Sequence, residues 1–220
     1  MIRADSKPLV KICGLQRKQD VDMCIRHGAD VLGFVVDYPM PVSWNLTIET
    51  AKELMTTVNP PAKSCVVTGG TAEHVCKIAK MLRPDYIQLH WNVSVAEATR
   101  LAATLKQLDV KLIQTIFPDT PDLAQVAADF CRTGICALLL DPRAQDNAEQ
   151  GGEADISLWH KIQASVTCPV ILAGGITPNN VEDTIKGSEV WMIDLMTGVE
   201  SAPGLKDENL VVELFKRLAG

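Results

Sequence analysis

Several classes of protein are excluded by what this 220-residue sequence lacks. It has no run of lysine and arginine, and its formal net charge is −6, so we expect no surface that binds nucleic acid. Aromatic residues make up only 5% of the chain, which also argues against a surface on which bases stack. No apolar run is long enough to cross a membrane. Residues 1–8 lack the apolar core of a signal peptide, so we expect a cytoplasmic protein without a membrane partner.

The cysteines follow neither a metal-ligand spacing nor a disulfide framework. Their number is odd, no two are spaced as Cys-x-x-Cys, and most lie in apolar runs. This usage is typical of reduced thiols in a cytosolic protein, so we expect neither a disulfide nor a metal site. The seven are Cys13, Cys24, Cys65, Cys76, Cys131, Cys136 and Cys168.

No apolar run is followed by Gly-x-Gly-x-x-Gly, which removes the usual dinucleotide site, and we expect no cofactor. Hydrophobic residues make up 47% of the chain, enough for one sizeable core. No linker or low-complexity segment interrupts it. We therefore expect a single domain over residues 1–220, and its oligomeric state stays open.

What the chain does contain is a regular alternation of short apolar runs and amphipathic segments. The apolar runs predict strands at Leu9–Ile12, Val31–Val36, Ser64–Val67, Tyr86–Leu89, Lys111–Ile116, Ala137–Leu140, Val170–Ala173 and Trp191–Leu195. The amphipathic segments predict helices at Arg17–His27, Ile48–Val58, Ala72–Leu82, Val95–Leu108, Leu123–Cys131, Ile156–Val166, Asn179–Lys186 and Glu208–Leu218. Eight strand–helix units in this length predict an α/β fold, a (β/α)8 TIM barrel, with a doubly wound open sheet as the alternative.

One stretch near the C-terminal end carries the first functional signal. Its apolar strand, Val170–Ala173, is followed by Gly174-Gly175 and then by Thr177-Pro178. The proline suits the first turn of a helix and the threonine suits its cap. Glycines allow close approach of a ligand, and helix N-termini attract anions such as phosphate. An ordinary strand-to-helix turn explains the same residues equally well.

Polar residues gather where the predicted strands end, which is where a barrel of this kind places its catalytic groups. Cys13 and Asp141 make a plausible proton-transfer pair, because a thiolate can take a proton and a carboxylic acid can donate one. Lys11 could hold the thiol ionised or bind an anion. Each residue also has a purely structural interpretation, as a core thiol, a turn cap or a satisfied polar group. The remaining candidates for substrate or phosphate binding are Gln88, His90, Gly174, Gly175, Asp194, Thr197 and Gly198.

A long polar loop follows the sixth predicted strand. It runs from Asp141 to Ala154 and contains two glycines. Such a loop is typical either of a lid over a site or of a plain surface connection.

The motifs at these strand ends resemble those of the phosphoribosylanthranilate isomerase family over almost the whole chain. The opening resembles it at residues 11–15 (Lys-Ile-Cys-Gly-Leu) and 28–35, and the fourth strand at 88–90 (Gln-Leu-His). The end of the chain resembles it at residues 173–181 and at 194–207, which contain Gly-Val-Glu and Pro-Gly-Leu-Lys-Asp.

The resemblance implies a cofactor-free barrel that isomerises N-(5-phosphoribosyl)anthranilate by an Amadori rearrangement in tryptophan biosynthesis. It implies that Asp141 is the general acid that opens the ribose ring and that Cys13 is the general base that removes the C2 proton. The phosphate is then expected on Gly174-Gly175 and Thr197-Gly198.

This sequence departs from the family pattern at four places. The family's Ser-Pro-Arg, whose arginine holds the anthranilate carboxylate, is replaced around Val42–Trp44. The glycine after Gln-Leu-His is replaced by Trp91-Asn92, the lid glycines read as 151–154 (Gly-Gly-Glu-Ala), and the Ser-Ser pair of the last strand reads Met196-Thr197. These changes leave three hypotheses. The protein is this isomerase, a paralogue that acts on another phosphorylated aminosugar, or a barrel without catalytic activity that binds a phosphorylated metabolite.

Another cation could take the place of the missing arginine. By loop position, the nearest are Lys11, Arg17 and Arg143.

Overall fold

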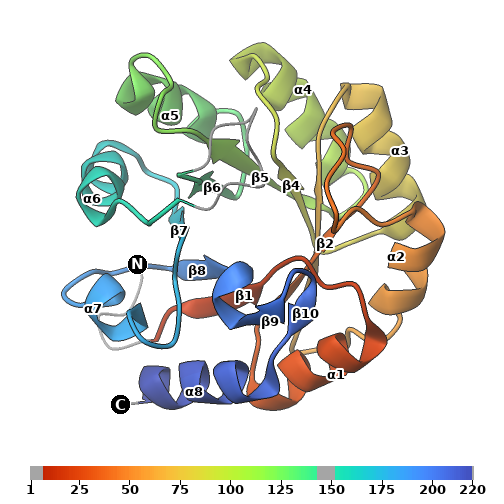
Figure 1. Cartoon of the computed structure of the whole chain (residues 1–220). Helices are drawn as coiled ribbons and strands as arrows, with labels where there is room; N and C mark the ends of the chain where they lie inside the picture. Colours follow the sequence, from red (N-terminus) through yellow and green to blue (C-terminus); the bar gives the residue numbers. More distant parts are fainter. Residues whose placement is uncertain (1–6, 143–151, 220) are drawn as a thin grey trace.

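The structure is a computed structural model, and it describes residues 7–142 and 152–219. Eight parallel strands close into a barrel in the order β1 to β8, and β8 pairs with β1. The helices surround the strands (Figure 1). The prediction of a TIM barrel is confirmed, and the alternative of an open sheet is wrong because both edges pair.

The strands begin and end close to the predicted positions. They are β1 (Leu9–Ile12), β2 (Val31–Val35), β3 (Lys63–Thr68), β4 (Tyr86–Leu89), β5 (Lys111–Ile116), β6 (Ala137–Leu140), β7 (Val170–Ala173) and β8 (Met192–Leu195). The main helices are α1 (Lys18–His27), α2 (Ile48–Met55), α3 (Ala72–Leu82), α4 (Val95–Lys106), α5 (Leu123–Cys131), α6 (Ile156–Ser165), α7 (Val181–Ile185) and α8 (Glu208–Ala219). After β8 come a 3-10 turn (Thr197–Val199) and a small antiparallel pair, β9 (Glu200–Ala202) and β10 (Leu205–Lys206).

The strands are mostly apolar, without a regular alternation, because both of their faces are buried. One set of side chains packs outward against the helices and forms the larger core cluster. The other set fills the barrel, with residues such as Val31, Tyr86, Ile113, Leu139 and Ile171. Since this interior is solid, the polar groups that follow it along the strands are held at the barrel's carboxyl end.

Four helices begin with side-chain caps, which account for where these helices start. In each, an oxygen of the capping side chain accepts a hydrogen bond from a backbone N–H of the first turn. The caps are Thr47, Thr71, Ser94 and Asp155.

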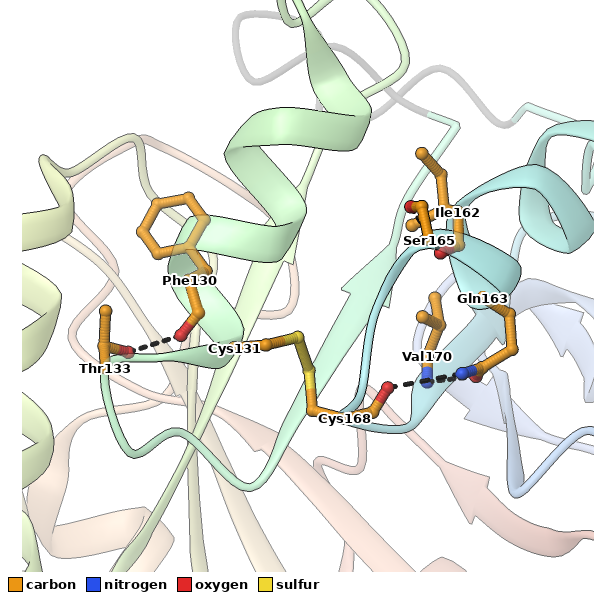
Figure 2. The surroundings of a disulfide bond; sticks show 8 residues. All are labelled: Phe130, Cys131, Thr133, Ile162, Gln163, Ser165, Cys168 and Val170. Carbon is orange, nitrogen blue, oxygen red and sulfur yellow. Dashed lines mark hydrogen bonds between the residues drawn. A yellow bond between two sulfur atoms is a disulfide. The ribbon is translucent and has the colours of Figure 1, made fainter.

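The expectation that all seven cysteines are reduced is wrong for two of them. Cys131, at the end of α5, forms a disulfide with Cys168, which precedes β7 (Figure 2). The two lie 37 residues apart in the sequence, and their Cα atoms are 5.6 Å apart. Sequence spacing gave no sign of the pair because the barrel, by placing α5 beside α6, brings these segments together. The other five cysteines are free thiols.

Within residues 7–142 and 152–219, no helix has both the length and the apolar character needed to cross a bilayer.

Candidate active site

A pocket opens at the carboxyl ends of the strands. One wall is apolar and comes from β2, β3 and the loop after β2, and the facing wall comes from the loops after β7 and β8. The apolar wall consists of Val35, Tyr38, Val42, Trp44 and Val67. The polar and glycine residues that line the pocket include Cys13, Gln88, His90, Gly174, Gly175, Asp194, Thr197, Gly198 and Glu200. Eight of the ten residues proposed from sequence therefore line one cavity.

The other two proposed residues, Lys11 and Asp141, are fully or almost fully buried and contact residues of the pocket. Lys11 Nζ donates a hydrogen bond to Asp194 Oδ2 at 2.8 Å, and the two residues are register partners on β1 and β8. Burial by itself lowers the pKa of Lys11, but the charges of Asp194, Cys13 and Cys65, together with the hydrogen bond to Asp194, outweigh burial and raise this pKa well above its ordinary value. Lys11 is therefore a cation that forms an ion pair with Asp194.

Cys13 follows directly after β1 and is 6% exposed. Its backbone N–H donates to the carbonyl of Leu195 at 2.8 Å, which ties the β1 end to the β8 end. Gly33 on β2 lies against it, and a Cβ at this position would come within 2.8 Å of Cys13 Sγ. The glycine is thus required for the thiol to reach the pocket.

A chain of hydrogen bonds joins the ends of β4 and β6 to the loop after β2. His90 Nε2 lies 3.3 Å from Asp141 Oδ2, and His90 Nδ1 lies 2.9 Å from Tyr38 Oη. The Tyr38 hydroxyl also donates to the His90 carbonyl at 3.0 Å. All three side chains are buried. Tyr38 was not among the candidates from sequence, because nothing in a tyrosine after a strand marks a contact 52 residues away.

The two glycine loops are packed against each other more tightly than any side chain would permit. A Cβ on Gly198 would lie 1.9 Å from the carbonyl oxygen of Ile176. Gly174 and Gly175 have φ angles of 103° and 57°, in the left-handed region that favours glycine. The loops after β7 and β8 therefore form one continuous wall.

The expected cap at Thr177 is wrong. Helix α7 begins later, at Val181, after Asn180. The Asn180 side chain instead bridges the preceding loop, accepting from the Thr177 N–H at 2.8 Å and donating to the Gly175 carbonyl at 2.9 Å. A carboxamide accepts through its oxygen and donates through its nitrogen, so this one side chain bridges two backbone groups of the loop.

A buried ion pair anchors the segment after β8. Lys206 Nζ lies 2.5 Å from Glu200 Oε1 and donates to the Met196 carbonyl at 3.1 Å. The Glu200 and Lys206 side chains are at most 5% exposed. Both residues lie in a motif noted from sequence, but their pairing was not foreseen because the pattern gives no register for β9 and β10.

Two of the sequence expectations concern residues that lie outside the described residues. The predicted lid, Asp141–Ala154, is described only at its two ends, 141–142 and 152–154, and Arg143 belongs to its undescribed part. At the ends, a Cβ on Gly174 would collide with the Pro142 ring, and the Ala154 N–H donates to the Gly174 carbonyl at 3.0 Å. Both ends of this loop therefore pack against Gly174, in the loop after β7.

Residues 10–217 match the family described as N-(5'phosphoribosyl)anthranilate (PRA) isomerase. The chain is 32% identical to the N-(5'-phosphoribosyl)anthranilate isomerase of Halobacterium salinarum, with 94% of each chain covered. It is also 32% identical to that of Nitrobacter winogradskyi, with 94% of this chain and 91% of the relative covered.

Among solved structures, the phosphoribosyl anthranilate isomerase of Thermus thermophilus superposes with a TM-score of 0.79. Its identity is 28%, with 96% of this chain and 98% of that chain covered. The structure of 3-keto-L-gulonate-6-phosphate decarboxylase from Vibrio cholerae also superposes, with a TM-score of 0.68 over 97% and 98% of the two chains. At 15% identity the second match reflects the barrel alone.

Proposed function

The chain belongs to the N-(5'-phosphoribosyl)anthranilate isomerase family, and we propose how its pocket performs the Amadori rearrangement of that substrate. The enzyme is an aldose–ketose isomerase of tryptophan biosynthesis. The observation that carries the assignment of roles is the convergence of Cys13, His90 with Asp141, and the two glycine loops on one pocket.

Asp141 acts as the general acid. It delivers a proton to the ribose ring oxygen, and the C1–O bond breaks as the anilino nitrogen forms a double bond to C1, which gives a Schiff base. Cys13 acts as the general base. Its thiolate removes the proton from C2, the electron pair forms the C1–C2 double bond of an enolamine, and tautomerisation gives the ketone. The two residues come from the ends of β1 and β6, on different sides of the barrel.

Binding groups surround this pair. The loops carrying Gly174-Gly175 and Thr197-Gly198 hold the phosphate, since glycine loops let backbone N–H groups approach a ligand. Gln88 Oε1 is buried and has no hydrogen-bond partner among the described residues. Because a buried acceptor without a partner is costly, it suits a sugar hydroxyl that donates to it. Asp194, fixed by Lys11, is a second acceptor for a hydroxyl.

One observation favours a second candidate, an isomerase of another phosphorylated aminosugar. Among the described residues that line the pocket there is no lysine or arginine, and the wall facing the glycine loops carries Val42 and Trp44. An anthranilate carboxylate placed there finds ring stacking and one indole N–H instead of a guanidinium fork. Arg143 lies outside the described residues. The third hypothesis, a silent barrel, is disfavoured by the presence of both Cys13 and Asp141.

Complementation of a tryptophan auxotroph that lacks this isomerase tests the function. The chain should restore growth, and Cys13→Ala and Asp141→Asn should each lower turnover of the purified enzyme by roughly 10²- to 10⁴-fold, the usual scale for a lost general acid or base. Cys76→Ala is the matched control, because Cys76 is a thiol on α3 outside the pocket. Near-normal turnover in either active-site variant would remove that residue from the mechanism. Failure of the folded parent chain to turn over the substrate would favour the other aminosugar.

A further inference from the structure

The contacts around His90 determine the protonation of its ring as well as its position, because each hydrogen bond needs one hydrogen from one of its two partners. Tyr38 Oη lies within bonding distance of two atoms of His90, the carbonyl oxygen at 3.0 Å and ring Nδ1 at 2.9 Å. A carbonyl oxygen can only accept, and a phenol has a single hydrogen to give. When that hydrogen serves the carbonyl, the contact with Nδ1 is a hydrogen bond only if Nδ1–H donates to the phenolic oxygen.

The protonation of Nδ1 also determines the role of the other ring nitrogen, Nε2. With Nδ1 protonated, Nε2 of a neutral His90 is an acceptor, and Asp141 Oδ2 lies 3.3 Å from it. A carboxylate oxygen and an unprotonated nitrogen repel each other, so this contact requires one proton between them, on Asp141 or on His90. The pair therefore holds one exchangeable proton in addition to the Nδ1 proton. This is the proton that a general acid must have available.

Tyr38 is held rigidly enough to impose this arrangement. The Asn45 side chain accepts from the Tyr38 N–H and donates to the Tyr38 carbonyl, both at 2.9 Å, so it fixes the backbone of Tyr38 from both sides. The ring packs edge-on against Trp91, with centroids 6.3 Å apart. Gly69 permits this packing, because a Cβ there would meet Trp91 at 2.8 Å and Tyr38 at 3.3 Å. On its other side, the His90 ring packs edge-on against Phe117.

We infer that Tyr38 is a positioning residue which locks His90 in its Nδ1–H form and so keeps a transferable proton on the His90–Asp141 pair. The inference rests on the role proposed for Asp141, and it adds a residue whose hydroxyl acts on the acid through His90. Without the hydroxyl, a buried Nδ1–H would lose its acceptor, which is costly. The imidazole then changes to the Nε2–H form and donates to an ionised Asp141. The His90–Asp141 pair then holds one proton fewer, and Asp141 has no proton to donate as the general acid.

The tautomer of His90 can be measured without any substrate. The chain contains four histidines, and ¹⁵N-histidine spectra of the parent and of His90→Gln identify the signals of His90. In the parent, Nδ1 should have the chemical shift of a protonated nitrogen. In Tyr38→Phe, Nδ1 should have that of an unprotonated one. Tyr86→Phe is the matched control, because Tyr86 is the second of two tyrosines and is also buried, inside the barrel, and it should leave the His90 signals unchanged. An unprotonated Nδ1 in the parent overturns the inference.

Kinetics provide the second test. Tyr38→Phe should lower kcat by about 10- to 100-fold, a part of the 10²- to 10⁴-fold contribution of a general acid, with KM changed less than about threefold. If Tyr38 acts through the pair, the same substitution should have almost no effect on kcat in the Asp141→Asn background. Equal losses in both backgrounds, or a kcat of Tyr38→Phe within about twofold of the parent, overturn the inference. If the parent has no activity on this substrate, the proposed function is wrong instead, and the spectra would still determine the tautomer of His90.

Discussion

Replacing Gly198 by alanine tests whether the contact between the two glycine loops forms the phosphate wall. The added Cβ would lie 1.9 Å from the Ile176 carbonyl oxygen, 2.9 Å from its carbonyl carbon and 3.3 Å from the Thr177 Cα. All three are backbone atoms, so no side chain can rotate out of the way. To reach even a 3.0 Å contact, the loop after β8 must move away from the loop after β7 by more than an ångström.

The structure gives the size of two effects. Forcing additional volume into a packed site typically costs about 1–3 kcal/mol of folding free energy. In a chain of this length each kcal/mol corresponds to roughly 2–4 °C in Tm, so Tm should fall by about 2–12 °C. The catalytic effect should be larger, since a misplacement of about 1 Å in a substrate-positioning element can reduce the rate on the order of 10²-fold.

The assay separates these effects. Turnover is measured below Tm for the parent, for Gly198→Ala and for Gly134→Ala, with inorganic phosphate as a competitive inhibitor. Gly134 is the control because its φ is 90° and a Cβ there meets nothing within 4 Å. Its alanine variant carries a comparable backbone cost of about 1–2 kcal/mol, in the loop before β6, at the opposite end of the barrel from the pocket. We expect kcat/KM to fall about 100-fold and phosphate inhibition to weaken only in Gly198→Ala.

Two outcomes would refute the reasoning. If Gly198→Ala keeps kcat/KM within about threefold of the parent, the spacing of the two loops does not position the substrate. If kcat/KM falls but phosphate inhibits the variant as well as the parent, the loops matter for a group other than the phosphate.

Three further predictions follow from other parts of the molecule. Trp44→Arg should lower KM for N-(5'-phosphoribosyl)anthranilate about 10-fold or more, because a charged hydrogen bond contributes about 1.5–3 kcal/mol; a low KM in the parent, not improved by the arginine, would contradict this. Burial raises the pKa of Cys24 to about 12 and that of Cys136 to about 11, from 9.0, and raises the pKa of Cys65 further, so the stability that these three neutral thiols contribute below pH 9 should be lost as pH rises, by about 1.4 kcal/mol per unit for each thiol, or about 4 kcal/mol per unit in all, between pH 9 and 11. Urea unfolding at pH 8 and pH 10 measures the loss, and equal midpoints would exclude it. Replacing Cys131 and Cys168 by serine should cost about 3–4 kcal/mol, from closure of a 37-residue loop, and a reductant should lower Tm in the parent but not in the double variant.

The barrel could be predicted from the sequence because the patterns that indicate its strands and helices are local. Each strand is apolar without alternation since it is buried on both faces, and each helix shows its own period and, in four cases, its own cap. Cys13 and the Gly174-Gly175 pair could be named as candidates for the same reason, since strand ends fix where such residues lie. Parallel pairing left the open sheet as an alternative, and only the pairing of β8 with β1 decided for closure.

What the sequence could not determine are contacts between segments distant along the chain. The hydrogen bonds of Tyr38 to His90, the pairing of Glu200 with Lys206 and the disulfide all depend on how loops are placed after the barrel has closed. The replacement of the Thr177 cap by Asn180 is a near-local case, but it too depends on where the crowded loop leaves the strand. Local patterns record the backbone preferences of neighbouring residues. The contact of His90 with Asp141 and the packing of the two glycine loops depend on distances between strand ends, which only the closed barrel provides.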